Sequence, residues 1–480
     1  MKNIISKTQK LKEIERDRKG KDDMAFKVTF IGAGSIAFTR EILSGILSVK
    51  EFADIRVCFH DINQKNLDMV TQLCQRDIES NGLNVKIEPT LNRREAVSGA
   101  KYIIVCVRIG GLEAFETDVN IPLKYGVDQC VGDTICAGGI MYGQRGIPAA
   151  LDFCRDIRET GEPGAMILNY ANPNAMMTWA CNKYGGVYTV GLCHGVQNGH
   201  KQIAAVFGLE QKDIDIICAG INHQTWYLSI KHNGAELKDK LLAAMENHPE
   251  YKETEKVRID ILRRFGYYST ESNGHLSEYL PWYRKRPGEI SKWIDLRGWI
   301  HGETGGYLRA CTKRRKWFET DFPNWMNAEP RKFDYASRGQ EHAAYMIESF
   351  ETGRIYRGHF NVVNNGCISN LPGDCIVEVP GYCDGMGISI PRVGELPHAC
   401  AAICGASVAV QRLAVEAAVG GDIYILRQAM MLDPLTGAVC SPEEIDRMTD
   451  EMLVAGEKWL PQYAQEIQEA KKRLKDTQIR

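Results

Sequence analysis

Residues 27–37 read Lys-Val-Thr-Phe-Ile-Gly-Ala-Gly-Ser-Ile-Ala, a short apolar strand that runs into a glycine-rich turn and then into a helix. Gly32 permits the tight turn, and Gly34 lets the backbone approach a pyrophosphate closely. Ser35 and Ile36 open the helix, whose free N–H groups and positive dipole end favour a phosphate group. The stretch therefore predicts a strand–turn–helix unit that binds a dinucleotide.

A second apolar strand, expected at 54–60, is followed directly by Asp61. A carboxylate at this distance from the glycine turn is typical of residues that bind the adenosine ribose. Its negative charge repels the 2′-phosphate of NADP, so NAD is the expected cofactor. The alternative is a glycine turn in an α/β fold that holds no cofactor, and the complete fingerprint weighs against it.

Strand and helix patterns alternate through the first half of the chain. We expect strands at 27–31, 54–60, 85–89, 102–107, 165–169 and 187–192. This alternation predicts a Rossmann-like, doubly wound parallel sheet, as in lactate and malate dehydrogenases. Later strands at 213–218, 225–231, 355–363 and 376–379, with helices at 238–265, 398–419 and beyond 443, predict a mixed α+β domain.

The expected organisation is a leader at 1–23, an NAD-binding Rossmann domain at 24–192 and an α+β domain at 193–480 that binds substrate and metal and mediates oligomerisation. The leader is charged and has no apolar core, unlike a secretory signal. The net charge of −2 argues against nucleic-acid and membrane partners. The 16 cysteines are scattered, which is typical of reduced thiols and predicts a cytoplasmic protein.

The strand expected at 165–169 leads into Asn172-Pro173, as in the 2-hydroxyacid dehydrogenases, which are the natural rival class. Those enzymes carry a Leu-Asp pair and an Arg after the next strand. Here the matching stretch ends in Cys193 and His194, so the carboxylate and the Arg are both missing. A non-enzymatic NAD-sensing protein is a further alternative.

Cys193 and His223 are candidate ligands of a divalent metal. Two ligands are too few for a closed structural zinc site, but they suit an open site completed by substrate and water. On the residues alone, a buried thiol and a hydrogen-bonded imidazole remain the simpler interpretation.

Several motifs together resemble one known family, glycoside hydrolase family 4, over nearly the whole chain after Met24. Its α-galactosidase branch is the most similar. The matching segments are 30–35, Asn169-Tyr-Ala-Asn-Pro173, Gly191-Leu-Cys-His194, Cys218-Ala-Gly-Ile-Asn-His223, Thr270-Glu-Ser-Asn-Gly-His-Leu-Ser-Glu-Tyr279, 370–372 with 377–380, and 430–434. The resemblance implies NAD, a divalent metal (usually manganese) held by Cys193 and His223, and a homodimer or homotetramer.

The resemblance also implies a redox-elimination mechanism rather than two-carboxylate hydrolysis. The sugar C3 hydroxyl is oxidised, C2 is deprotonated, the aglycone is eliminated, water adds, and C3 is reduced again. Tyr279 matches the base of the family, with Tyr283 as a weaker candidate. His194 is a candidate acid or substrate contact, and Asn172 matches a position near substrate and nicotinamide.

Two features leave the substrate open. Asp133, expected near the substrate, is followed by Thr-Ile-Cys-Ala rather than the Gly-Pro-Gly-Gly that follows an Asp-Thr pair in the family. Arg108 stands where a neutral residue is expected in α-galactosidases, and an Arg suits a phosphate or a carboxylate. The resemblance favours α-galactosides, and a hexuronide, an α-glucoside or a sugar 6-phosphate remains an alternative.

Overall fold

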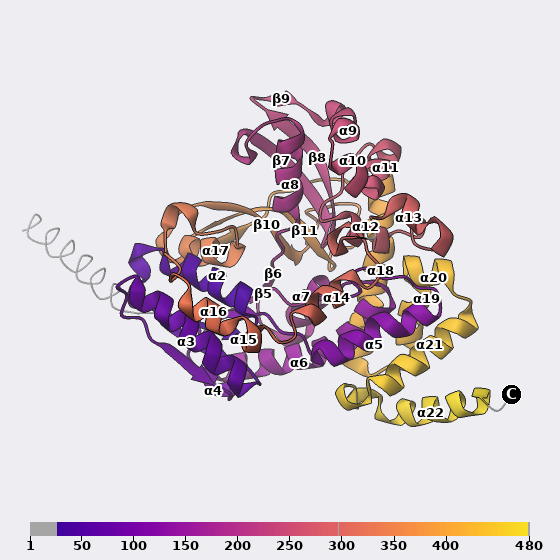
Figure 1. Cartoon of the computed structure of the whole chain (residues 1–480), viewed down its shortest axis with the longest axis horizontal. Helices are drawn as coiled ribbons and strands as arrows, with labels where there is room; N and C mark the ends of the chain where they lie inside the picture. The colour runs from indigo at the N-terminus through magenta and orange to yellow at the C-terminus, as the bar shows by residue number, and fades with distance from the viewer. Residues whose placement is uncertain (1–25, 296, 479–480) are drawn as a thin grey trace, which may run out of the picture.

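The computed structural model describes residues 26–295 and 297–478, so the expected leader at 1–23 lies outside the described residues (Figure 1). In the described chain, twelve strands form one sheet in the order β3-β2-β1-β4-β5-β6-β10-β11-β7-β8-β9, with β12 paired to β11. The strands are β1 (Lys27–Ile31), β2 (Arg56–His60), β3 (Ile87–Thr90), β4 (Tyr102–Val105), β5 (Met166–Asn169), β6 (Thr189–Gly191), β7 (Ile214–Ile221), β8 (Gln224–His232), β9 (Ala235–Glu236), β10 (Tyr356–Val363), β11 (Ile376–Asp384) and β12 (Gly387–Ser389).

The first six strands are all parallel and follow the order 3-2-1-4-5-6. This is the strand order of the dinucleotide-binding fold, and it places the carboxyl ends of β1 and β4 side by side. Most of these strands are buried, and β1 and β4 are buried at every residue, whereas the edge strand β3 is buried only at Ile87. The expected Rossmann-like parallel sheet is therefore confirmed.

The sheet continues into the second half of the chain. β10 pairs antiparallel with β6, where Asn361 lies opposite Gly191, and β11 pairs with β7, where Glu378 lies opposite Gly220. Figure 1 shows β10 and β11 crossing the middle of the molecule between β6 and the β7–β8 hairpin. The two halves thus share one sheet, and the boundary expected between 192 and 193 remains a prediction.

The helices are α2 (Ile36–Leu47), α3 (Gln64–Ser80), α4 (Arg93–Val97), α5 (Gly111–Lys124), α6 (Cys136–Thr160), α7 (Asn174–Ala180), α8 (Gly195–Val206), α9 (Lys238–Asn247), α10 (Tyr251–Thr254), α11 (Lys256–Phe265), α12 (Asn273–Tyr279), α13 (Ile290–Trp293), α14 (Gly306–Lys313), α15 (Trp317–Thr320), α16 (Phe322–Asn327), α17 (His342–Thr352), α18 (His398–Gly420), α19 (Ile423–Leu432), α20 (Pro434–Val439), α21 (Pro442–Ala455) and α22 (Ala464–Gln478). Among the described helices, α18 alone is long and apolar enough to cross a membrane, and half of its most apolar window is buried inside the fold.

The observed bounds differ from the expected ones in two instructive places. The helical region expected at 238–265 is divided into α9, α10 and α11. His248 is extended because it precedes Pro249, and a proline disfavours the helical conformation of the residue before it. The strand expected at 376–379 continues to Asp384, because β11 pairs with β10 over that whole length and β12 folds back on its end.

Candidate active site

A cavity of about 1150 Å³ opens at the carboxyl ends of β1, β4, β5 and β6. Ligands of parallel α/β sheets bind at this edge. The expected site residues that line the cavity are Gly32, Gly34, Ser35, Asp61, Arg108, Asp133, Asn172, Cys193, His194 and His223. Two expected residues, Ile36 and Tyr279, do not line it.

The glycine turn between β1 and α2 is shaped by close contacts. Gly32 has a φ of +86°, and a Cβ atom there would lie 2.6 Å from the carbonyl oxygen of Cys106. A Cβ atom at Gly34 would lie 2.7 Å from Asp61 Oδ2, the same oxygen to which the Gly34 N–H donates at 2.8 Å. Gly32 therefore tolerates no side chain, and a side chain at Gly34 displaces the Asp61 carboxylate.

The backbone N–H groups at the N-terminus of α2 are available to bind an anion. No side chain caps this end, and no acidic residue lies in its first turn. By contrast, Asn63 caps α3, and a capping box of Ser441 and Glu444 closes α21. Uncapped N–H groups and the helix dipole favour a phosphate, and Asp61 lines the cavity beside the turn. The residues present at this end of the cavity fit a dinucleotide.

Three potential metal ligands meet deeper in the cavity. Ligand atoms of Cys193, His223 and Glu271 all lie within 4.8 Å of one another, and Cys193 Sγ is 3.6 Å from Glu271 Oε2. Cys193 follows β6, and His223 sits in the two-residue turn between β7 and β8 with a φ of +63°. Glu271 also has a left-handed backbone, with a φ of +71°. The fold thus brings together three side chains from separate segments of the chain.

The chemical state of these residues suits a bound cation. Burial, followed by repulsion from His275, lowers the pKa of His223 to about 3, and its buried Nδ1 has no hydrogen-bond partner. Burial, followed by the carboxylates of Glu271 and Glu378, raises the pKa of the Cys193 thiol well above its usual range. A neutral imidazole has a free lone pair, and a thiol in such surroundings ionises when a metal binds. The donor set therefore fits a divalent metal with an open coordination position.

Arg108, Asp133 and Asn172 form a linked group on the cavity wall. Arg108 Nη2 donates to Asp133 Oδ2 at 2.9 Å, and Asn172 Nδ2 donates to Asp133 Oδ1 at 3.3 Å. Burial raises the pKa of Asp133, and the guanidinium and the amide act in the opposite direction. Both oxygens of this carboxylate are therefore engaged by neighbouring side chains.

His194 lies at the N-terminus of α8, where its side chain is 37% exposed and borders the cavity. Its Nδ1 is 3.7 Å from Glu341 Oε1, and its ring stacks 6.4 Å from that of Phe38. Burial raises the pKa of Glu341, and His194 counteracts this effect. This imidazole–carboxylate pair is placed where a proton can pass to a ligand.

Tyr279 occupies the last residue of α12, behind the cavity wall. Its side chain is buried, and burial raises the pKa of its hydroxyl well above the usual range, although the Thr134 side chain acts in the opposite direction. Asp133 is close enough to act electrostatically on Tyr279. Tyr283 points elsewhere and donates a hydrogen bond to Asp260 Oδ2 at 2.9 Å, which is a structural role.

Glu271 and His275 are site residues that the sequence reasoning missed. Both line the cavity, and the rings of His275 and His223 lie 4.4 Å apart in an edge-to-face contact. The sequence signal for them lies in the segment 270–279, in which the family resemblance points only to Tyr279. A conspicuous Glu-x-x-x-His spacing in that segment places both side chains near His223.

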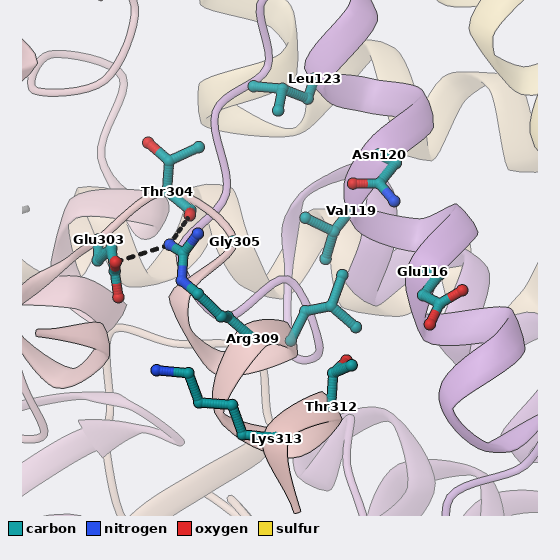
Figure 2. A pocket seen from close by; sticks show the side chains of 11 residues that line it. Glu116, Val119, Asn120, Leu123, Glu303, Thr304, Gly305, Arg309, Thr312 and Lys313 are labelled. Atoms are coloured by element: carbon teal, nitrogen blue, oxygen red, sulfur yellow. Dashed lines mark hydrogen bonds and ion pairs between the residues drawn. The ribbon is translucent and has the colours of Figure 1, made fainter. Parts of the chain in front are cut away.

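A second hollow, of about 710 Å³, lies on the surface between α5 and α14 (Figure 2). Two of its charged groups engage each other, since Arg309 pairs with Glu303 at 2.7 Å and also donates to the Thr304 carbonyl at 2.9 Å. Among its described lining residues there is no cysteine or histidine. The hollow therefore lacks the convergent ligands that distinguish the larger cavity.

Comparison with known proteins places the chain in a family. The family model for family 4 glycosyl hydrolases matches residues 27–209, and the model for their C-terminal domain matches residues 218–436. An α-galactosidase of Rhizobium meliloti (strain 1021) is 58% identical over 94% of this chain and 92% of its own length. An α-galactosidase of Bacillus subtilis (strain 168) is 33% identical over 91% of this chain and 99% of its own length.

A solved structure is also similar along most of the chain. It is the 6-phospho-beta glucosidase from Thermotoga maritima with manganese, NAD+ and glucose-6-phosphate, with a TM-score of 0.74 and 25% identity. The match covers 90% of this chain and 99% of that one. Taken with the family models and the α-galactosidase relatives, it shows that the chain belongs to family 4 of the glycosyl hydrolases.

Proposed function

We propose that this glycosyl hydrolase acts on α-galactosides and uses NAD and a divalent metal, preferably manganese. The observation that carries the proposal is the cluster of Cys193, His223 and Glu271 in the same cavity as the glycine turn. The two α-galactosidases at 58% and 33% identity support the substrate class. The Thermotoga maritima structure, which contains manganese and NAD+, supports the cofactors.

The two ends of the cavity have separate tasks in this proposal. Gly32, Gly34 and Asp61 hold the dinucleotide, and Cys193 and His223 hold the metal, with the Glu271 carboxylate beside them. When bound, NAD supplies a hydride acceptor for oxidation at the sugar C3, and the metal supplies Lewis-acid polarisation of the neighbouring sugar oxygens. A ketone at C3 makes the proton at C2 acidic, so a base of this chain can remove it.

Two residues are candidates for that base, and geometry separates them. Glu271 lines the cavity, with Oε2 3.6 Å from Cys193 Sγ and Oε1 3.8 Å from His275 Nδ1. Tyr279, the base that the family resemblance implies, lies behind the wall and does not line the cavity. A general base must reach the proton that it removes. We therefore place Glu271 first and keep Tyr279 as the second candidate.

His194 is the proposed acid for the leaving group. As the aglycone leaves C1, its oxygen takes a proton from the imidazole, and Glu341 stabilises the charged ring before that transfer. The exposed edge of His194 and its 3.7 Å distance from Glu341 support this role. Asn172 and Asp133 offer hydrogen-bonding groups that orient the sugar hydroxyls.

The experiment is hydrolysis of p-nitrophenyl α-galactoside with and without NAD and Mn²⁺, in the presence of a thiol reductant. Hydrolysis should require both, and galactose released in D₂O should carry deuterium at C2. Glu271→Gln and Tyr279→Phe, compared at saturating Mn²⁺, rank the two bases, since loss of a general base lowers turnover by roughly 10²- to 10⁴-fold. Hydrolysis without NAD, with hydrogen retained at C2, would contradict the mechanism. Accumulation of NADH together with an oxidised sugar whose glycosidic bond is still intact would instead indicate a dehydrogenase.

We further propose that the protein works in the cytoplasm as a homo-oligomer. All 16 cysteines are free, and most are buried, which suits a reducing compartment. Large apolar side chains are exposed along α19, where Tyr424 and Leu432 are 76% and 57% exposed. Such residues are typical of surfaces that pair with another copy. Light scattering that gives the mass of a single chain would contradict the oligomer.

A further inference from the structure

The lysine and arginine side chains that line the cavity are all paired with acidic residues. Three arginine or lysine residues line it in the described chain, and each is already in an ion pair with an acidic residue. The pairs are Arg93 with Asp156 at 2.7 Å, Arg108 with Asp133 at 2.9 Å, and Lys458 with Glu113 at 2.6 Å. No described lysine or arginine of the cavity is therefore free to bind an anionic substrate.

Arg108 is linked through Asp133 to Asn172, and its surroundings enclose it further. Its guanidinium carbon lies 4.3 Å from the ring centre of Phe115, 5.2 Å from that of Tyr142 and 5.5 Å from that of Tyr307. Its side chain is 23% exposed. The three rings and Asp133 hold the guanidinium in place, so it cannot swing freely toward a phosphate or a carboxylate.

Asp133 neutralises the positive charge of Arg108 at the cavity wall. Its side chain is 1% exposed, with one oxygen bound by Arg108 and the other by Asn172. The Glu271 carboxylate lies close enough to repel Asp133. An anionic sugar group next to Arg108 would meet these two acidic residues and would have to displace Asp133 from its hydrogen bonds.

We propose that the Arg108–Asp133 pair makes the cavity selective for sugars without a charged group, so that sugar 6-phosphates and hexuronides are excluded. Arg108 then orients Asp133 as an acceptor for sugar hydroxyls rather than binding an anion itself. This inference deepens the proposed function and rests on it only in placing a sugar in this cavity. In this inference, Asp133 is the residue that discriminates between neutral and anionic substrates.

The test compares four ligands on the intact protein with Mn²⁺ and NAD present: galactose, glucose, galacturonate and galactose 6-phosphate. Calorimetry measures their dissociation constants, and inhibition of p-nitrophenyl α-galactoside hydrolysis gives a second readout. The natural protein should bind galactose at least roughly 10-fold more tightly than either anion. An anion beside Arg108 would break the charge-assisted hydrogen bond between Arg108 and Asp133, and the Asp133 carboxylate would repel it.

Asp133→Asn keeps the shape of the side chain and removes its charge. It should shift the ratio of anion to galactose affinity toward the anions by roughly 10- to 100-fold, even if binding of galactose weakens. Glu246→Gln is the matched control, because it makes the same change in charge at an exposed ion pair, that of Glu246 with Arg263, outside the cavity. It should leave the ratio within about twofold, as expected for a solvent-screened pair.

Equal or tighter binding of galacturonate or galactose 6-phosphate by the natural protein would overturn the inference, and this comparison decides even if Asp133→Asn does not fold. An unchanged ratio in a folded Asp133→Asn protein would also overturn it. Binding of glucose in place of galactose, with both anions still excluded, would refute the proposed α-galactoside substrate and leave the charge selectivity intact. The two failures are therefore distinguishable.

Discussion

Replacing Gly34 by alanine tests whether the glycine turn holds a dinucleotide. The new Cβ atom would lie 2.7 Å from Asp61 Oδ2, whereas an ordinary carbon–oxygen contact is about 3.3 Å or more. The carboxylate must therefore retreat by about 0.6 Å, which lengthens the 2.8 Å hydrogen bond from the Gly34 N–H to as much as about 3.4 Å and weakens it. A second bond, from the Asn63 N–H at 2.9 Å, is strained by the same movement.

The expected cost follows from what Asp61 does. A hydrogen bond to a charged group contributes about 1.5–3 kcal/mol, so a misplaced Asp61 should weaken NAD binding by roughly 10- to 150-fold. Titration calorimetry with NAD on the metal-free protein measures this change without any need for turnover. The fold should survive, because the atom that meets the new methyl group is the end of a side chain at a cavity edge.

Gly405→Ala is the matched control for this prediction. Gly405 lies inside α18, and a Cβ atom there would meet nothing within 4 Å. The substitution should leave NAD affinity unchanged and raise the melting temperature by roughly 1 °C, since alanine favours a helix over glycine by up to about 1 kcal/mol. An unchanged NAD affinity in a folded Gly34→Ala protein would refute the assignment of this turn to the cofactor.

Three other changes test separate parts of the site. Cys193→Ser and His223→Ala should each lower the Mn²⁺ content measured by atomic absorption and abolish turnover, with the far-ultraviolet circular dichroism unchanged; full activity in excess EDTA would argue against a catalytic metal. Asp61→Ala should narrow the preference for NAD over NADP in calorimetry, and equal affinities already present in the natural protein would contradict the role of this carboxylate. Burial raises the pKa of Glu378 to about 8, so the folded state binds a proton more tightly than the unfolded state, and stability should fall as pH rises from about 4.5 toward 8. Glu378→Gln should remove that part of the pH dependence when the free energy of unfolding is measured by urea denaturation with chelator present. If the free energy of unfolding of the variant changed with pH as steeply as that of the natural protein, the raised pKa of Glu378 would be refuted.

Much of the dinucleotide half could be predicted from the sequence, because its signals are local. The strand at 27–31, the glycine turn and Asp61 after the second strand each depend on neighbouring residues, and the structure places them as expected. Apolar strands that alternate with helices indicate a parallel sheet, since such strands must be covered on both faces. The pairing of Cys193 with His223 was also predicted, but through the family resemblance rather than from their spacing.

The tertiary structure decided which other side chains reach the cavity. Glu271 and Tyr279 belong to one sequence motif, and the left-handed backbone of Glu271 turns its carboxylate toward Cys193 while α12 carries Tyr279 behind the wall. A motif read as a string does not show which of its residues faces the cavity, because that depends on where the helix begins and how it packs. The sequence did not predict that both halves share one sheet, because β10 pairs with β6 although the two strands are far apart in the sequence.

The sequence by itself determined the parallel sheet, the glycine turn and the acidic residue beside it, because short-range sterics and apolar periodicity specify them. Only the tertiary structure paired Arg108 with Asp133 and surrounded the guanidinium with three aromatic rings. An isolated arginine in a sequence suggests an anion site, whereas an arginine bound to a buried carboxylate does not. The charge that a substrate meets is set by which side chains the fold brings within a few ångströms of one another, and that depends on long-range packing.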